Sequence, residues 1–343
     1  MWKNRQSVNG VLEQYALDLS GTEVEFLGNH GGFSGAQLWK IRERAGERTC
    51  CLRRWPGGLE AKETLERIHS LLAQASRSGF DDRLLPRPLV NRSGKGVTRS
   101  GNHLFELTAW LPGQADYWNQ PTDTRLRAAA RTLAEFHAAT GCSPAAKRRE
   151  QESGLPGLRK RINFIRDLRE GLLSRIEGEL GKALPQPLGW LREPGWQVLQ
   201  HFKNLSPEIE SRLQSMEKRP WSRQVCIRDI WHDHLLFEGS RVSGLVDFGA
   251  IGTDHVATDI SRLFGSLFGS CSRHWEFALR EYQAVSELLP PELELIVVYD
   301  RSTTMLAGLS WLKWILVENR TFETWLPIKQ RLESLLKRMS DWT

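Results

Sequence analysis

Hydrophobic positions alternate with polar ones over short runs in the first third of the chain. The stretch "EVEFLGNHGGFSGAQLWKIRERAGERTCCLRRW", residues 23–55, predicts three strands joined by a glycine-rich turn and by a polar turn containing Gly46. "GLEAKETLERIHSLLAQA" instead repeats its apolar residues at the spacing of a helix. "GVTRS" and "NHLFELTAWL" predict another strand pair, which ends before Pro112 and Gly113. Residues 20–112 are therefore predicted to form strands and one helix.

Helical periodicity dominates the rest of the chain. "TDTRLRAAARTLAEFHAA" begins this part, with Thr122 or Asp123 as its N-cap. Further helices are predicted at about residues 157–178, 206–217, 274–287, 291–318 and 323–340. A strand hairpin within residues 226–266 interrupts them. The pattern predicts an α+β protein with a small antiparallel-sheet lobe, residues 1–110, packed against a mainly helical lobe, residues 111–343.

Composition narrows the class of protein. Of the 343 residues, 40% are hydrophobic and 26% are charged, which is typical of a soluble globular chain. The net charge of +6 is mild and accompanies no nucleic-acid motif, so no nucleic-acid partner is expected. No apolar run approaches the roughly 18 residues of a membrane span, and the start lacks a signal-peptide core. Five cysteines without C-x-x-C spacing indicate neither a disulfide framework nor a zinc site, which favours a cytoplasmic location.

The stretch "CIRDIWHDHLLFEGSRVSGLVDFGAIGTDHVATDISRLFGS", residues 226–266, carries the candidate chemistry. Asp229 precedes the predicted hairpin and Asp247 ends it, 18 residues later, so both are expected at one edge of a small sheet. His234, at the start of the first hairpin strand, is expected beside them. Phosphoryl transfer needs one carboxylate to hold the acceptor hydroxyl and another to bind the metal ion that neutralises the nucleotide phosphates.

These residues resemble the catalytic core of the aminoglycoside/choline phosphotransferase family, whose fold is related to that of protein kinases. The family shows a loop of the form H-G-D-x-x-x-x-N and a D-F-G-like motif after a hairpin; this chain has "IRDIWHDH" and "VDFG" there. The resemblance implies a two-lobed protein-kinase-like fold, Asp229 as catalytic base and Asp247 as a metal ligand. It also implies that Asp259 caps a helix and holds the catalytic loop from behind.

The upstream segments resemble the family in the same order. "GNHGGFSGAQLWKI" is the candidate nucleotide loop, in which Gly31, Gly32 and Gly35 permit close backbone approach and Ser34 offers a donor. Arg53 stands where these kinases carry the phosphate-binding residue of the third strand. Its expected partner is a carboxylate on the next helix. Glu63 fits best, but Glu60 and Glu66 share its face and stay alternatives.

The chain departs from the family pattern in two places. Ile227 and Arg228 replace the His-Gly before the catalytic Asp, and Arg228 is assigned either a structural role or contact with an anionic group. His234 replaces the asparagine that completes the metal site. Because Mg²⁺ prefers oxygen ligands, a histidine weakens Mg²⁺ binding, favours Mn²⁺ instead, or accompanies a loss of activity.

The leading hypothesis is an ATP-dependent kinase that phosphorylates a hydroxyl of a sugar, an amino alcohol or an aminoglycoside-like molecule, with Mg²⁺ or Mn²⁺. The first alternative is a pseudokinase that binds nucleotide or a partner without transfer, prompted by Ile227 and His234. The second is a metal-binding module or metal hydrolase built on His232, His234, Asp247 and His255. The residues identify neither the acceptor nor the oligomeric state.

Overall fold

The protein is described by a computed structural model over residues 5–17, 19–28, 35–43, 48–141, 152–322 and 324–342. Its contacts divide the chain into two compact units. The first comprises Met1–Thr140 and His232–Ile251, and the second comprises Gly141–Trp231 and Gly252–Thr343. No helix among the described residues is both long and apolar enough to cross a bilayer.

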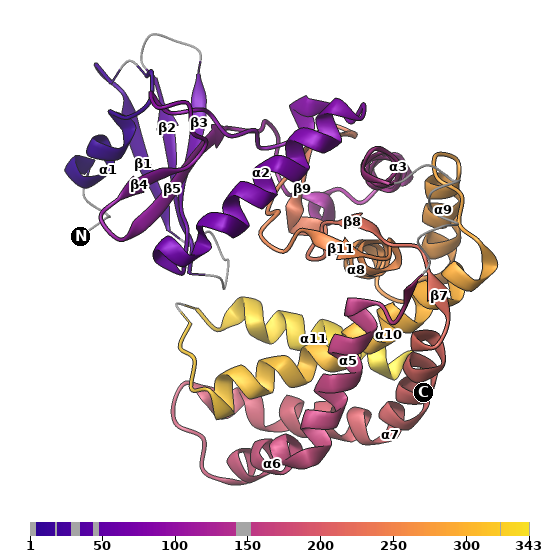
Figure 1. Ribbon diagram of the computed structural model, residues 1–343. Coiled ribbons are helices and arrows are strands. Elements are labelled where there is room, and N and C mark those ends of the chain that lie inside the picture. The colour runs from indigo at the N-terminus through magenta and orange to yellow at the C-terminus, as the bar shows by residue number, and fades with distance from the viewer. Residues whose placement is uncertain are drawn as a thin grey trace. The chain divides into compact units, whose positions relative to one another are not determined.

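The first unit is built on an antiparallel sheet of five strands in the order β1-β2-β3-β5-β4 (Figure 1). The strands are β1 (Glu23–Gly28), β2 (Gln37–Arg42), β3 (Thr49–Arg54), β4 (Thr98–Ser100) and β5 (His103–Ala109). Helix α1 (Arg5–Leu12) contributes Val8, Val11 and Leu12 to the core on this sheet. The predicted strands of this region are therefore present, and the alternation of buried and half-buried positions along β2 and β3 follows the pleat of the sheet.

Two helices and a hairpin complete the first unit. Helix α2 (Lys62–Arg77) comes after the short helix Gly58–Ala61 and buries Leu65, Ile68, Leu72 and Ala75. Helix α3 (Asp123–Thr140) packs against α2 and against strand β10 of the hairpin β9 (Leu235–Glu238) and β10 (Arg241–Leu245). Short 3-10 helices lie at Asp82–Leu84, Tyr117–Asn119 and His232–His234.

This grouping differs from the predicted lobe boundary at residue 110, which assigned α3 and the hairpin to the helical lobe. Phe136 of α3 packs against Phe80 and Phe248, and Arg125 of α3 donates a hydrogen bond to the carbonyl of Gly239 at the hairpin turn. These contacts tie α3 and the hairpin to the sheet-bearing unit. The division into two functional lobes stays a prediction.

The second unit is mainly helical. Its helices are α5 (Pro156–Asp167), α6 (Leu173–Gly181), α7 (Arg192–Glu217), α8 (Ala257–Phe268), α9 (Ser272–Gln283), α10 (Pro290–Leu312) and α11 (Leu326–Ser340). Single helical turns lie at Leu168–Leu172, Leu188–Leu191 and Lys313–Val317. Strand β8 (Gln224–Cys226) pairs with β11 (Gly252–Asp254), and β6 (Glu152–Ser153) with β7 (Pro220–Trp221). Helix α10 packs against α7, α8 and α11 and forms the centre of the unit.

Two predicted helices differ from the structure by more than a few residues at their ends. The helix expected at 206–217 is the last half of α7, which continues through Pro207 because Val198, Leu199 and Phe202 bury the preceding turns. Packing of these side chains outweighs the cost of a proline inside a helix. The helix expected at 157–178 is interrupted at Leu168–Leu172, where Gly171 has φ 134°.

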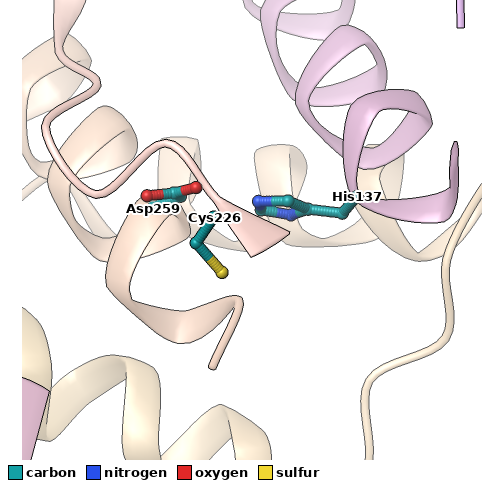
Figure 2. A group of neighbouring side chains, drawn as sticks. All are labelled: His137, Cys226 and Asp259. Atoms are coloured by element: carbon teal, nitrogen blue, oxygen red, sulfur yellow. The ribbon is translucent and has the colours of Figure 1, made fainter. Parts of the chain in front are cut away.

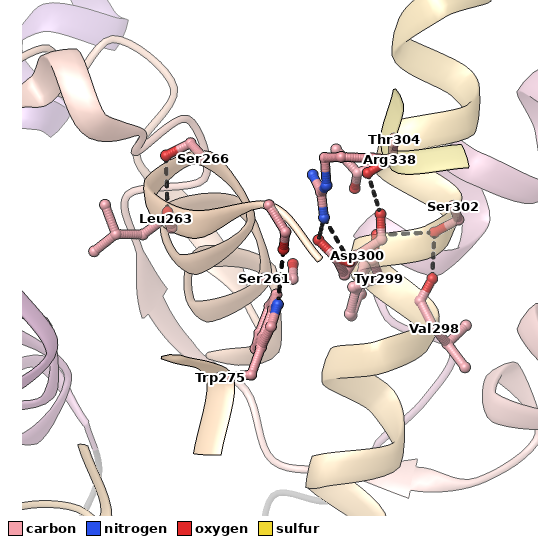
Figure 3. A network of polar contacts seen from close by, with 12 residues as sticks. Ser261, Leu263, Ser266, Trp275, Val298, Tyr299, Asp300, Ser302, Thr304 and Arg338 are labelled. Atoms are coloured by element: carbon pink, nitrogen blue, oxygen red, sulfur yellow. Dashed lines mark hydrogen bonds and ion pairs between the residues drawn. The ribbon is translucent and has the colours of Figure 1, made fainter. Parts of the chain in front are cut away.

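A buried ion pair joins α10 to α11 in the second unit. Both Oδ atoms of Asp300 accept hydrogen bonds from Arg338, at 2.6 and 2.7 Å, and both side chains are little exposed (Figure 3). Gly265 of α8 leaves the space for this pair, because a Cβ there would lie 2.5 Å from Oδ1 of Asp300. Burial raises the pKa of Asp300, while the adjacent Arg338 opposes that rise.

We expect Arg338→Met to lower the free energy of unfolding by about 3 to 5 kcal/mol at neutral pH, because it leaves the Asp300 carboxylate buried without a counter-charge. Urea unfolding would measure the loss. The double variant Arg338→Met with Asp300→Leu should recover a large part of it, since no charge is then left buried. Equal losses in the single and the double variant would contradict this account.

Candidate active site

The candidate nucleotide-binding residues of the first unit centre on Asp247. Nη2 of Arg53, on β3, donates to Oδ1 of Asp247 at 3.2 Å. Nε2 of His234 lies 3.8 Å from the other carboxylate oxygen, Oδ2. The structure therefore brings together three residues that were predicted as site residues from separate segments of the chain.

The backbone at Asp247 is held in an uncommon conformation. Asp247 has φ 59°, a left-handed value that side-chain-bearing residues seldom adopt. It lies just beyond the end of β10, and the amide of Gly249 donates to its Oδ1. A Cβ at Gly249 would lie 3.2 Å from this same oxygen, so the glycine permits the tight turn. The turn aims the Asp247 carboxylate at Arg53 and His234 instead of away from the sheet.

The charge on Asp247 is stabilised by its neighbours. Burial alone would raise the pKa of Asp247, but the charges of Arg53 and His234 and the hydrogen bonds from Arg53 and the Gly249 amide hold that pKa below its usual range. The carboxylate is therefore ionised at neutral pH, as metal binding requires. The 3.8 Å between Nε2 of His234 and Oδ2 of Asp247 suits two ligands of one divalent ion. These two residues thus fit a metal ion, and the imidazole favours a softer ion than Mg²⁺.

A second network supports Arg53 from the side of the sheet and involves residues that the sequence did not single out as site residues. The Arg53 guanidinium lies 4.3 Å from the ring centre of Trp55, and Nε1 of Trp55 donates to Glu106 at 2.8 Å. The other carboxylate oxygen of Glu106 lies 2.9 Å from Nε2 of His69 on α2. Glu106 is opposite Arg53 in the β3–β5 register. The network connects α2 to Arg53 through a buried carboxylate and an indole ring.

The expected pairing of Arg53 with Glu63 does not occur. Glu63 lies exposed in the first turn of α2, as do Glu60 before the helix and Glu66, which pairs with Lys62. The apolar face of α2 (Leu65, Ile68, Leu72, Ala75) turns inward, so these three glutamates face solvent. Among the described residues Arg53 forms its ion pair with Asp247, and α2 reaches the sheet through His69.

The candidate nucleotide loop lies mostly outside the described residues. Gly31, Gly32 and Ser34 belong to that part, and their assignment stays a prediction. Gly35 is described and has φ 77°, a conformation that glycine adopts without steric cost. It stands two residues before β2, at the end of the predicted turn.

The candidate catalytic loop lies in the second unit and is held by Asp259 of α8. Its two carboxylate oxygens accept hydrogen bonds from the amides of Ile227 and Arg228, both at 2.6 Å. Figure 2 shows Asp259 beside Cys226, the last residue of β8, with His137 of α3 as the third residue drawn. Asp259 is fully buried, so these charge-assisted bonds are made without competition from water. The loop is thus fixed at the two residues before Asp229.

Arg228 also has a left-handed backbone, with φ 69°. The corresponding position of the family pattern is glycine, which takes this conformation freely, whereas arginine takes it at a cost of about 1 kcal/mol or more. The bond from its amide to Asp259 offsets this cost. Asp229 is the next residue, and its Oδ1 accepts a hydrogen bond from Nη2 of Arg262, one turn after Asp259 on α8. Arg262 is a further residue that the sequence did not identify.

The histidines of the alternative metal site are placed differently from one another. His232 contacts Asp233 through Nδ1 at 2.8 Å and lies edge-on to Trp118. His255 is buried, and both of its ring nitrogens are engaged: Nδ1 accepts from the amide of Ala257, and Nε2 lies 2.9 Å from Glu292. A metal ion at His255 would have to displace these bonds. Of this set, only His234 and Asp247 are brought into the geometry of a shared ion.

We expect Arg53→Met to lower the free energy of unfolding by about 1 kcal/mol at pH 7, as is typical for a partly exposed ion pair. Because the pKa of Asp247 is lowered in the folded protein, the stabilisation is present above the unfolded-state pKa of about 3.9 and is lost as pH falls through the folded-state value. Urea unfolding at a series of pH values should therefore show the two proteins converging at acid pH. The matched control Arg42→Met removes an exposed pair on β2 and should change little at any pH; a constant difference for Arg53→Met would contradict the account.

We expect Asp259→Asn to destabilise the fold by about 2 kcal/mol or more, because the amide replaces one acceptor oxygen by a donor that faces a backbone N–H. Thermal or urea unfolding would measure the change. Ser266→Ala, which removes a hydroxyl bonded within the same helix, is the control and should lie within about 0.5 kcal/mol of the parent. An Asp259→Asn variant as stable as this control would mean that the carboxylate does not hold the loop.

Comparisons with known proteins identify the family and the fold of the chain. A model of the phosphotransferase enzyme family (APH) matches residues 26–296. Among solved structures, a spectinomycin phosphotransferase in complex with ADP and spectinomycin aligns with TM-score 0.66 at 10% identity, covering 98% of this chain and 97% of that one. A microcompartment-associated aminopropanol kinase aligns with TM-score 0.65 at 13% identity over 99% and 97%. An aminoglycoside phosphotransferase from Alicyclobacillus acidocaldarius gives 0.60 at 16% over 97% and 93%.

A sequence search of curated proteins found no match. The structural neighbours confirm the predicted fold, a protein-kinase-like α+β fold with an antiparallel sheet and a helical remainder. The family model covers well over half of the sequence and includes the segments of β3, the catalytic loop and Asp247. The chain therefore belongs to the phosphotransferase enzyme family.

Proposed function

We propose that the protein is an ATP-dependent kinase that transfers the γ-phosphate to a hydroxyl of a small molecule. The observation that carries this proposal is the convergence of Arg53 and His234 on the two oxygens of Asp247. A cation for phosphate and a pair of metal ligands at one carboxylate are what a nucleoside triphosphate with its metal ion requires.

Arg53 binds the nucleotide phosphates. Its Nη2 is engaged by Asp247, while its Nε is buried and has no hydrogen-bond partner among the described residues. The ring of Trp55 fixes the plane of the guanidinium, and Glu106 fixes the ring. Gly31, Gly32, Ser34 and Gly35 form the loop over the phosphates by analogy with the family pattern, and Glu63 is not needed for this role.

His234 and Asp247 hold the metal ion, Mg²⁺ or Mn²⁺. When bound, the ion neutralises charge on the phosphates and orients them for transfer. Asp247 is kept ionised for this by the charge and the hydrogen bond of Arg53. The imidazole of His234 must be neutral to act as a ligand. A nitrogen ligand in place of the family's asparagine oxygen favours Mn²⁺ over Mg²⁺.

Asp229 orients the acceptor hydroxyl and accepts its proton. The acceptor oxygen forms a bond to the γ-phosphorus as the bond from that phosphorus to the β,γ-bridging oxygen breaks, and ADP leaves. The ion pair with Arg262 fixes the orientation of the Asp229 carboxylate. Asp259 fixes the backbone of the loop just before Asp229. The loop therefore does not have to sample other backbone conformations to position Asp229.

A thermal shift with ATP, GTP and ADP, each with Mg²⁺ or Mn²⁺, tests the proposal. A nucleotide at 100 times its dissociation constant should stabilise the fold by about 2.7 kcal/mol, a shift of several degrees. We expect the metal-dependent part of the shift to be larger with Mn²⁺ and to be lost in Asp247→Ala. No shift with any nucleotide up to millimolar concentrations would exclude the kinase function.

A protein that binds nucleotide without transfer is the second candidate. It is favoured by the direct contact of Arg262 with the proposed base and by Ile227 in place of the family's histidine. Turnover distinguishes the two candidates. The kinase is established if ADP forms with an acceptor, and if Asp229→Asn abolishes this ADP formation but keeps the nucleotide-dependent thermal shift. A nucleotide shift with no such turnover would favour the second candidate.

A further inference from the structure

Asp229 lies among cationic side chains of the second unit. Arg262 contacts it directly, and Arg228 precedes it in the loop. Lys160 on α5 is close enough for the charges of Arg228, Arg262 and Asp229 all to act on it. Its neighbour Arg161 bonds to the carbonyl of Gly157 and to Thr303 and stacks on Tyr299. Three cations from three segments of sequence therefore gather around one proposed base, and the charges of two of them, Arg228 and Arg262, also act on Arg161.

The acidic residues of this region are turned inward. Asp259 is 0% exposed and binds the loop amides, and Asp254 is 1% exposed and bonds to Tyr299 and to the amide of His255. The cations face outward instead: Lys160 is exposed, and the Arg262 side chain is 30% exposed. Asp229, with a side chain 48% exposed, is the acidic member of the outward-facing group. The solvent side of this group thus carries a surplus of positive charge.

The crowding of cations shows in their proton affinities. Although Lys160 is exposed as a whole residue, partial burial of its side chain and then the charges of Arg228, Arg161 and Arg262 lower its pKa. Burial also lowers the pKa of Arg161 to about 10, an effect that Tyr299 and Asp254 oppose and that the charges of Arg262 and Arg228 reinforce. The Nε atoms of Arg161 and Arg262 are buried and have no hydrogen-bond partner among the described residues. An anion bound here would relieve this repulsion.

We infer that the phosphate acceptor is itself an anion, a hydroxy compound that carries a phosphate or carboxylate group, and that Lys160, Arg228 and Arg262 bind that group beside Asp229. This rests on the proposed kinase function. Arginine and lysine recognise both anions by charge-assisted hydrogen bonds. A polycationic acceptor would be repelled by the same residues, so an aminoglycoside is disfavoured.

The arginine at position 228 fits this assignment. A residue there must adopt φ 69°, and the glycine of the family pattern does so at no cost. Arginine in its place brings a positive charge to the residue before the base. In the reaction, the guanidinium of Arg228 holds the acceptor's anionic group, while the hydroxyl gives its proton to Asp229 and its oxygen forms the new bond to phosphorus. The electron pair of the broken phosphorus–oxygen bond leaves with ADP.

The first test measures anion binding directly. Inorganic phosphate is titrated calorimetrically into protein saturated with ADP and Mn²⁺, so that the nucleotide site is filled. We expect saturable binding that weakens with added salt and falls about tenfold in each of Lys160→Ala and Arg228→Gly. Arg228→Gly suits the backbone at that position, so it should fold. Lys182→Ala, which removes the same charge at the end of α6, is the control and should bind as the parent does.

The second test uses matched three-carbon acceptors. Glycerol 3-phosphate and glycerate are anionic, glycerol is neutral and 1-amino-2-propanol is cationic, and ADP formation is measured with each. We expect both anions to compete with inorganic phosphate for binding, whereas glycerol and the amine do not. The stronger of the two anionic competitors shows whether the site prefers a phosphate or a carboxylate group. Turnover with the amine or with glycerol but with neither anion would overturn the inference.

The outcomes also separate this inference from the kinase proposal. A nucleotide thermal shift without phosphate binding, or phosphate binding unchanged in both variants, would refute the anionic acceptor and leave the kinase intact. A loss of the nucleotide shift in Lys160→Ala, with phosphate binding retained, would mean that the cations serve the nucleotide and would also refute it. Absence of any nucleotide shift in the parent protein would remove the kinase function itself.

Discussion

The candidate catalytic loop depends on the two hydrogen bonds that the amides of Ile227 and Arg228 donate to the Asp259 carboxylate. A buried carboxylate is costly unless each oxygen finds a donor, and here two backbone donors that no regular strand or helix uses fill that need. The stabilisation is mutual, because the two loop amides would lose their hydrogen-bond acceptor without the Asp259 carboxylate. The loop is therefore held in place by α8 and by the β8–β11 strand pair.

Left-handed backbone at Arg228 and Asp247 has a common meaning. Each residue lies just beyond the end of a strand, at or next to a carboxylate of the candidate site, where the chain leaves the extended conformation. Strain of this kind persists only where the surroundings fix it, and at both positions a backbone amide does so by donating a hydrogen bond to an aspartate carboxylate. The two turns are stabilised differently, because Gly249 relieves crowding beside Asp247, whereas the loop at Arg228 relies on Asp259.

The sequence predicted those features that are encoded within short segments. Asp229, Asp247 and Asp259 fall in short motifs that can be recognised without knowledge of the fold. The strands of the sheet follow from the alternation of apolar and polar residues within single runs. The partner of Arg53 could not be found in this way. Glu63 is near in sequence and of the right charge, but the exposed face of α2 is set by its apolar residues, and helix periodicity alone had left three glutamates open. The contacts of Trp55, Glu106 and His69 could be seen only from the register of β3 against β5. Those of Lys160 and Arg262 could be seen only from the packing of helices that carry no motif.

The anchored loop has a kinetic consequence. A loop that samples many conformations must be ordered when a ligand arrives, which slows productive encounters and makes the association rate depend on the ligand. Here the two residues before Asp229 are fixed by Asp259, and Asp229, the proposed base, is bound by Arg262, through contacts made entirely within the chain. Related acceptors should then associate at similar rates, and discrimination among them should appear in how long each stays bound.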